Sequence, residues 1–151
     1  MAHVIDSGDE LERRASQLYP NTFNGDCSNG NQSPTQQVEE RSPYMGPEPG
    51  ARALGVVGTT PVLIVGSRNG VIYVFKMRGV SADFESAHRE GSTNDIWNNL
   101  YAIEAAGDQI ISDMGFVGAG NSPSGTPFVY VIVQATGSLS VYNVVDVPDI
   151  F

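Results

Sequence analysis

TPFVYVIVQATGSLSVYNV, residues Thr126–Val144, carries the clearest structural pattern in the chain. It reads as two strands joined by a glycine-containing turn. Phe128–Val133 is a continuous run of β-branched and aromatic residues, which is typical of a strand buried on both faces. After Gly137, Leu139 and Val141 alternate with more polar residues in the period-two pattern of a half-buried strand. The stretch therefore predicts an antiparallel hairpin.

A second stretch, earlier in the chain, repeats this pattern. Thr60–Met77, TPVLIVGSRNGVIYVFKM, opens on the same Thr-Pro pair and turns at Gly70, as the later copy turns at Gly137. Each hairpin follows a short apolar segment, which is Ala53–Val57 in one copy and Met114–Ala119 in the other. Repeated antiparallel meanders are typical of β-propeller blades, which stack face to face. Two unrelated hairpins in a sandwich are the alternative.

The sequence thus predicts an all-β, β-propeller-like fold with about two blades of antiparallel meanders and two short helices. We expect a helix and a flexible acidic loop in residues 1–50, a first blade in 51–77, a helix in 92–107 and a second blade in 110–146. The strands should form two separate sheets: Ala53–Val57, Val62–Val65 and Val71–Phe75 in one, and Met114–Gly118, Phe128–Val133 and Ser138–Val144 in the other.

Two segments show helical periodicity. Asp9–Leu18 has a thin apolar stripe, and Ser7 with Glu10 matches a capping box at its start. Asn94–Ala106 has a broader stripe that includes the single tryptophan, Trp97, which we expect to anchor the helix by packing.

Composition limits the classes of function. The net charge is −9, with 17 acidic against 8 basic residues, so nucleic acid is not an expected partner. An acidic surface attracts cations such as calcium. No apolar run approaches the ~20 residues of a membrane span, and the first residues lack signal-peptide architecture. The single cysteine, Cys27, excludes an internal disulfide.

Motifs for common catalytic chemistry are missing from the sequence. It has no phosphate-binding P-loop, no H-E-x-x-H metal motif, no paired C-x-x-C and no G-x-S-x-G elbow. Arg78 to Asp95 reads as a polar connection after the first meander, and His88, beside Arg89 within it, is expected to be a solvated loop residue. Asn31 begins an Asn-Gln-Ser sequon and is a predicted glycosylation site. No catalytic residue and no organic cofactor are predicted.

Several runs resemble the choice-of-anchor I domain family. They are VIDSGDELERRASQLYP from Val4, GPEP at Gly46–Pro49, VLIVGSRNGVIYVF, and SDMGFVGAGNSPSGTPFVYVIVQATGSLSVYNV, which ends at Val144. Within the family the chain is most similar to the mesenchyme-specific cell-surface glycoproteins of mineralising animals. The resemblance implies a propeller-like, extracellular or cell-surface protein linked to skeleton formation. Family domains are much longer, which implies that upstream blades of the same domain are missing from this chain.

The resemblance also indicates two candidate metal ligands. The family often carries G-P-E-P-E-G where this chain reads GPEPGA from Gly46, and P-E-G where this chain reads Ile111-Ser112-Asp113. If the family glutamates bind a cation, Glu48 and Asp113 are the residues that remain here. Calcium is the cofactor that this reading implies.

These observations favour a non-enzymatic matrix or cell-surface glycoprotein, an interaction module linked to biomineralisation with weak calcium association. Its expected partners are matrix or cell-surface proteins, mineral ions and the missing blades. Because bacterial relatives are often labelled alkaline phosphatase-like, a phosphatase-like hydrolase is the alternative, and an inactive truncated copy is another.

Overall fold

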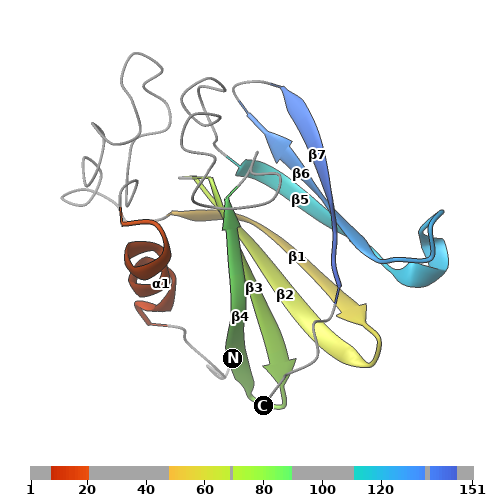
Figure 1. The fold of residues 1–151 in the computed structure, drawn as a ribbon, viewed down its shortest axis with the longest axis horizontal. Helices are drawn as coiled ribbons and strands as arrows, with labels where there is room; N and C mark the ends of the chain where they lie inside the picture. Colours follow the sequence, from red (N-terminus) through yellow and green to blue (C-terminus); the bar gives the residue numbers. More distant parts are fainter. Residues whose placement is uncertain (1–7, 21–47, 69, 90–110, 135–136, 146–151) are drawn as a thin grey trace, which may run out of the picture.

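The fold stacks a helix, a four-stranded sheet and a three-stranded sheet in that order (Figure 1). The computed structural model describes residues 8–20, 48–68, 70–89, 111–134 and 137–145. Helix α1 spans Glu10–Leu18. The first sheet contains β1 Pro49–Val57, β2 Thr60–Ser67, β3 Val71–Arg78 and β4 Ser81–Arg89, and the second contains β5 Ile111–Val117, β6 Phe128–Val133 and β7 Ser138–Asn143. A short 3-10 helix, Ala119–Asn121, follows β5.

Each sheet is an antiparallel meander, because every described strand pairs with its neighbour along the chain. The all-β prediction is therefore confirmed, and the six predicted strands are divided between the two sheets as expected. The glycines of the two repeated turns, Gly70 and Gly137, have φ angles of 81° and 60°, which glycine adopts without strain. The propeller prediction is not confirmed, since the described strands form two open sheets and no closed ring.

Strand β4 lies in a stretch whose sequence predicted a polar connection. A β-bulge explains why its pattern was missed: Ser86 pairs with Val74, but the next pair joins Phe84 to Phe75, so Glu85 is an extra residue. The bulge breaks the alternation of side chains along the strand. A search for period two therefore finds no continuous strand here.

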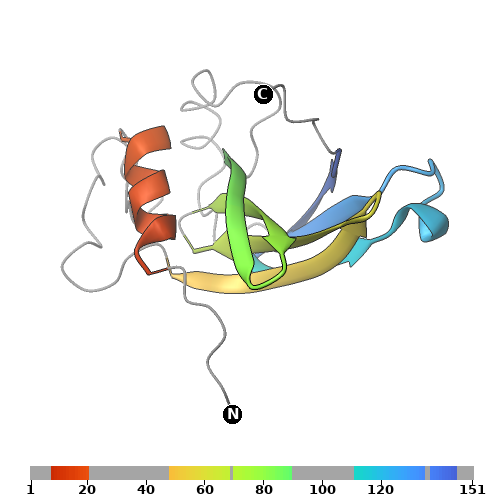
Figure 2. The ribbon, with the colours of Figure 1, turned by 90° about the horizontal axis from the view of Figure 1, so that it is seen from below.

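Helix α1 covers one face of the first sheet, on the side away from the second sheet (Figure 2). The predicted apolar stripe is confirmed, because Ala15 and Tyr19 are buried against Tyr73 and Phe75 of β3. Arg14 adds a cation–π contact, with its guanidinium carbon 4.3 Å from the centre of the Phe84 ring.

The start of α1 differs from the predicted capping box. The N-cap is Asp9, with no side-chain capping bond, and Glu10 accepts hydrogen bonds from Arg13 and Arg14. These partners lower the pKa of Glu10, the Arg14 hydrogen bond most strongly. Ser7 lies outside the described residues, as do Trp97 and the second predicted helix, Asn94–Ala106.

The two sheets meet through apolar side chains on the other face of the first sheet. The buried residues of this inter-sheet core are Ala51, Ala53, Ile64, Ile72, Ile111, Met114, Val129 and Val131. Two glycines allow β5 to lie close to the first sheet. A Cβ at Gly55 would stand 2.1 Å from the Phe116 ring, and one at Gly66 would stand 2.6 Å from a methyl carbon of Ile111. Glycine is therefore required by the close approach of the sheets.

Replacing Gly55 by alanine should destabilise the fold by about 1–3 kcal/mol, because the new methyl group overpacks the contact with Phe116. Gly118→Ala is the matched control, since Gly118 has an ordinary φ of −69° and a Cβ added there would have no atom within 4 Å. Urea denaturation at one protein concentration measures both. Equal stability of the two variants would contradict the close contact.

Candidate binding site

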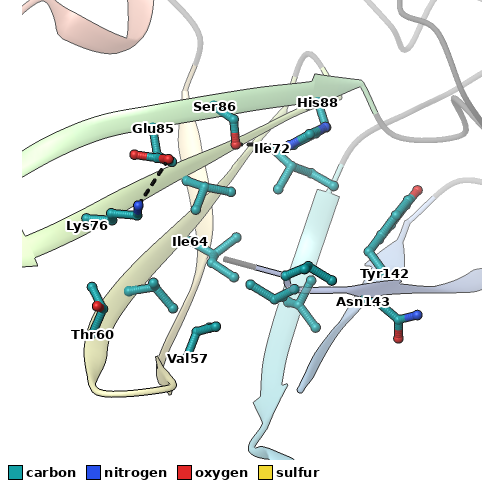
Figure 3. Close-up of a pocket in the computed structure, with 15 residues that line it drawn as sticks. Val57, Thr60, Ile64, Ile72, Lys76, Glu85, Ser86, His88, Tyr142 and Asn143 are labelled. Carbon is teal, nitrogen blue, oxygen red and sulfur yellow. Dashed lines mark hydrogen bonds and ion pairs between the residues drawn. The ribbon is translucent and has the colours of Figure 1, made fainter. Parts of the chain in front are cut away.

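A pocket of about 470 Å³ lies between the two sheets, on the side where β3 and β4 face β6 and β7 (Figure 3). Most of its wall is aliphatic. The apolar lining residues are Val57, Val62, Ile64, Ile72, Val74, Val129, Val144 and Val145. The polar lining residues are Thr60, Lys76, Glu85, Ser86 and His88 from the first sheet, and Tyr142 and Asn143 from the second. An apolar cavity with a few placed polar groups is the usual form of a small-molecule site.

The bulge in β4 creates the polar wall of this pocket. Because Glu85 is the extra residue, both Glu85 and Ser86 line the cavity. Glu85 pairs with Lys76, whose Nζ lies 3.2 Å from Oε1, and the Lys76 side chain is only 9% exposed. The two opposite charges neutralise each other beside the aliphatic wall, where an unpaired charge would be costly.

His88 lies on β4 and lines the pocket, so its assignment to a loop was wrong, whereas its expected exposure to solvent is confirmed. Its Nε2 lies 3.0 Å from the Ser86 hydroxyl oxygen. The side chain keeps access to solvent, yet neighbouring atoms desolvate the ring and lower the pKa of His88 below its ordinary value of 6.5. The neutral ring is therefore favoured at neutral pH.

The outer face of the second sheet is a separate apolar surface. On β6, Val129, Val131 and Val133 are buried, but Ile132 on the opposite face is 37% exposed. On β7, Leu139 and Val141 are 64% and 56% exposed. The prediction that β6 is buried on both faces is therefore wrong, because among the described residues only the first sheet packs against it.

The predicted metal ligands have protein partners. Glu48 precedes Pro49 with a φ of 47°, an unusual backbone for a non-glycine residue. Its carbonyl oxygen accepts the Arg68 N–H at 3.1 Å, and its carboxylate lies 3.8 Å from the Arg68 guanidinium. Asp113 is exposed on β5 and accepts the Met114 N–H at 2.8 Å.

No cluster of three or more metal-ligating side chains occurs within the described residues. The calcium expectation at Glu48 and Asp113 therefore rests on the sequence resemblance. The predicted glycosylation site, Asn31, lies outside the described residues.

Sequence reasoning missed the residues of the polar pocket wall. Lys76, Glu85, Ser86 and His88 belong to no known motif, and the bulge obscured the strand that carries three of them. One signal was present: a lysine at the end of the apolar run Val71–Phe75 faces a stretch with a glutamate and a histidine. This signal can be recognised only when the pairing register of β3 with β4 is known.

Stability should depend on pH through His88. The folded protein binds the His88 proton less readily than the unfolded chain, so its free energy of unfolding falls as the pH drops below about 6.5. Thermal melts at pH 7.5 and 5.5 should show a smaller loss for His88→Gln than for the original chain. Carboxylates contribute equally to both proteins and cancel in this comparison. An identical loss in both proteins would contradict the desolvation of His88.

Comparison with known proteins identifies the family. The family model described as the Choice-of-anchor I domain matches residues 1–80. Gigasin-3a from Magallana gigas is 29% identical over 148 residues, a region that covers 95% of this chain and 52% of the relative. The chain thus spans about half the length of this curated relative. No solved structure gives a significant match. Since the family model covers more than half of the sequence, the chain belongs to the choice-of-anchor I domain family.

Proposed function

We propose that the chain is a non-enzymatic interaction module of a cell-surface or extracellular matrix protein. Its binding surface is the outer face of the second sheet, formed by Ile132, Leu139 and Val141. The family membership and the similarity to Gigasin-3a support a surface or matrix role. Within the described residues, no helix has the length and apolar character needed to cross a membrane.

The exposure of these three side chains is the observation that carries the proposal. Ile132 and Leu139 are direct cross-strand partners, and Val141 pairs with Tyr130 on the same face. The residues therefore form a continuous patch and are not scattered. Contiguous apolar patches on a protein surface mark sites of protein association.

The partner that fits this face is another β-sheet with an apolar face. The two described sheets already pack through aliphatic faces of the same kind, in the core that includes Ile64 and Val131. The chain spans about half of its curated relative, and further sheets of such a domain, the upstream blades of a propeller, would cover Leu139 and Val141. A matrix or cell-surface protein would dock through the same patch if that sheet were absent.

Charge on the patch should weaken association of the isolated chain. We expect the 151-residue chain to self-associate at micromolar concentration, and Leu139→Glu to weaken that association by about tenfold or more, equivalent to ~1.4 kcal/mol. Leu54→Glu is the matched control, because Leu54 is 69% exposed on β1 of the first sheet. Sedimentation velocity over a range of concentrations measures both. A concentration-independent monomer, or equal effects of the two variants, would contradict the assignment of this face.

The biomineralisation role is a further part of the proposal. The support for it is the resemblance to mesenchyme-specific cell-surface glycoproteins and the net charge of −9. Such a role requires weak association with calcium, for which Glu48 and Asp113 are the proposed residues.

Calcium binding should be detectable by isothermal titration calorimetry, with a dissociation constant of about 10⁻³ M, as for many extracellular sites. The double variant Glu48→Gln/Asp113→Asn should bind several-fold more weakly. Glu12→Gln/Asp83→Asn, which removes the same two negative charges from α1 and β4, is the control. The absence of any calcium-dependent heat at millimolar ion would contradict the calcium proposal while leaving the apolar patch untouched.

A further inference from the structure

We propose that the pocket between the sheets binds an uncharged, mainly aliphatic small molecule that carries one or two hydrogen-bonding groups. This site is distinct from the outer face of the second sheet, so the inference does not depend on the proposed function.

The packing of the two sheets produces the cavity. At Gly55 and Gly66 the first sheet lies against Phe116 and Ile111 of β5, with no space for even a methyl group. Contacts between the sheets are concentrated at β1, β2 and β5 and are sparse toward β3 and β4. The pocket lies on that second side, and its volume of about 470 Å³ falls within the range of about 300–1,000 Å³ that small-molecule sites occupy.

The walls select an aliphatic ligand. Strands from both sheets contribute valine and isoleucine side chains, with Ile64 and Ile72 on one side and Val129 on the other. The lining has two aromatic rings, the phenol of Tyr142 on β7 and the imidazole of His88 on β4, among mostly aliphatic side chains (Figure 3). Flat aromatic ligands gain most from ring stacking, for which a mainly aliphatic wall offers little surface. A flexible aliphatic body buries its surface against the branched side chains without needing a stacking partner.

The electrostatics of the pocket select an uncharged ligand. The Lys76 ammonium and the Glu85 carboxylate lie 3.2 Å apart, so their charges largely cancel at the cavity wall. Partial desolvation lowers the pKa of His88, so the neutral form of its ring is favoured at neutral pH. An anion or a cation entering the pocket would lose its hydration without meeting a net countercharge.

Hydrogen-bonding groups at the edge would orient the ligand. His88 and Ser86 lie side by side on β4, with 3.0 Å between Nε2 and the hydroxyl oxygen. A neutral imidazole has one donor and one acceptor nitrogen, and the serine hydroxyl can both donate and accept. A hydroxyl or amide group on the ligand fits this pair.

Three probes with the same alkyl chain test the proposal: 1-octanol, octanoate and octylammonium. Isothermal titration calorimetry of each against the full chain at pH 7.5 should give saturable binding of 1-octanol that is about tenfold tighter than binding of either charged probe. Tighter binding of a charged probe, or no saturable binding of 1-octanol, would overturn the proposal.

A pair of phenylalanine variants locates the site, and a third variant tests the charge argument. Val74→Phe fills the pocket and should weaken 1-octanol binding by about tenfold, whereas Val56→Phe, the same change at a residue that is 52% exposed on β1, should leave it unchanged. Glu85→Gln leaves Lys76 without that countercharge, and the preference should shift toward octanoate. Equal effects of the two phenylalanine variants, or an unchanged probe preference in Glu85→Gln, would overturn the assignment. If Val74→Phe fails to fold, the probe preference of Glu85→Gln still tests whether the ligand binds in this pocket.

Discussion

The close contact of β5 with β1 and β2 is the constraint on which the arrangement of the sheets depends. Side chains normally hold packed sheets about 10 Å apart. At Gly55 and Gly66 that spacer is missing, and Phe116, Ile111 and Met114 occupy the space instead. The second sheet is therefore held tightly along one side of the first sheet. The apolar core and the pocket both follow from this one-sided contact.

The molecule is consequently asymmetric in how its apolar surfaces are covered. The first sheet is covered by the second sheet on one face and by α1 on part of the other, where Leu54 and Val56 of β1 remain exposed. The second sheet is covered once among the described residues, so Leu139 and Val141 remain exposed. Toward β3 and β4 the sheets leave a cavity, and the bulge at Glu85 places polar groups on its wall. The tight contact stabilises the fold, while the uncovered face and the cavity are the surfaces available for binding.

Local sequence patterns correctly predicted the elements that are determined by neighbouring residues in the chain. The repeated Thr-Pro hairpins, the turn glycines and the stripe of α1 all gave correct elements, because period and turn chemistry act over a few residues. Strand β4 was missed because its bulge disrupts the period at Glu85. The exposure of Leu139 was missed because it depends on which layer covers β7, and alternation alone does not specify that. The pocket residues Lys76 and His88 meet only through strand register and sheet packing, so no sequence motif could indicate them.

A double-mutant cycle between Gly55 and Phe116 tests the central contact most directly. Gly55→Ala and Phe116→Ala are made singly and together, and the free energy of unfolding of all four proteins is measured by urea denaturation. Direct contact predicts that alanine at position 55 is much less destabilising when Phe116 has been truncated, with a coupling energy within the ~0.5–3 kcal/mol seen for touching residues. If the cost of Gly55→Ala is the same in both backgrounds, the sheets do not meet at this point, and the pocket between them loses its structural basis.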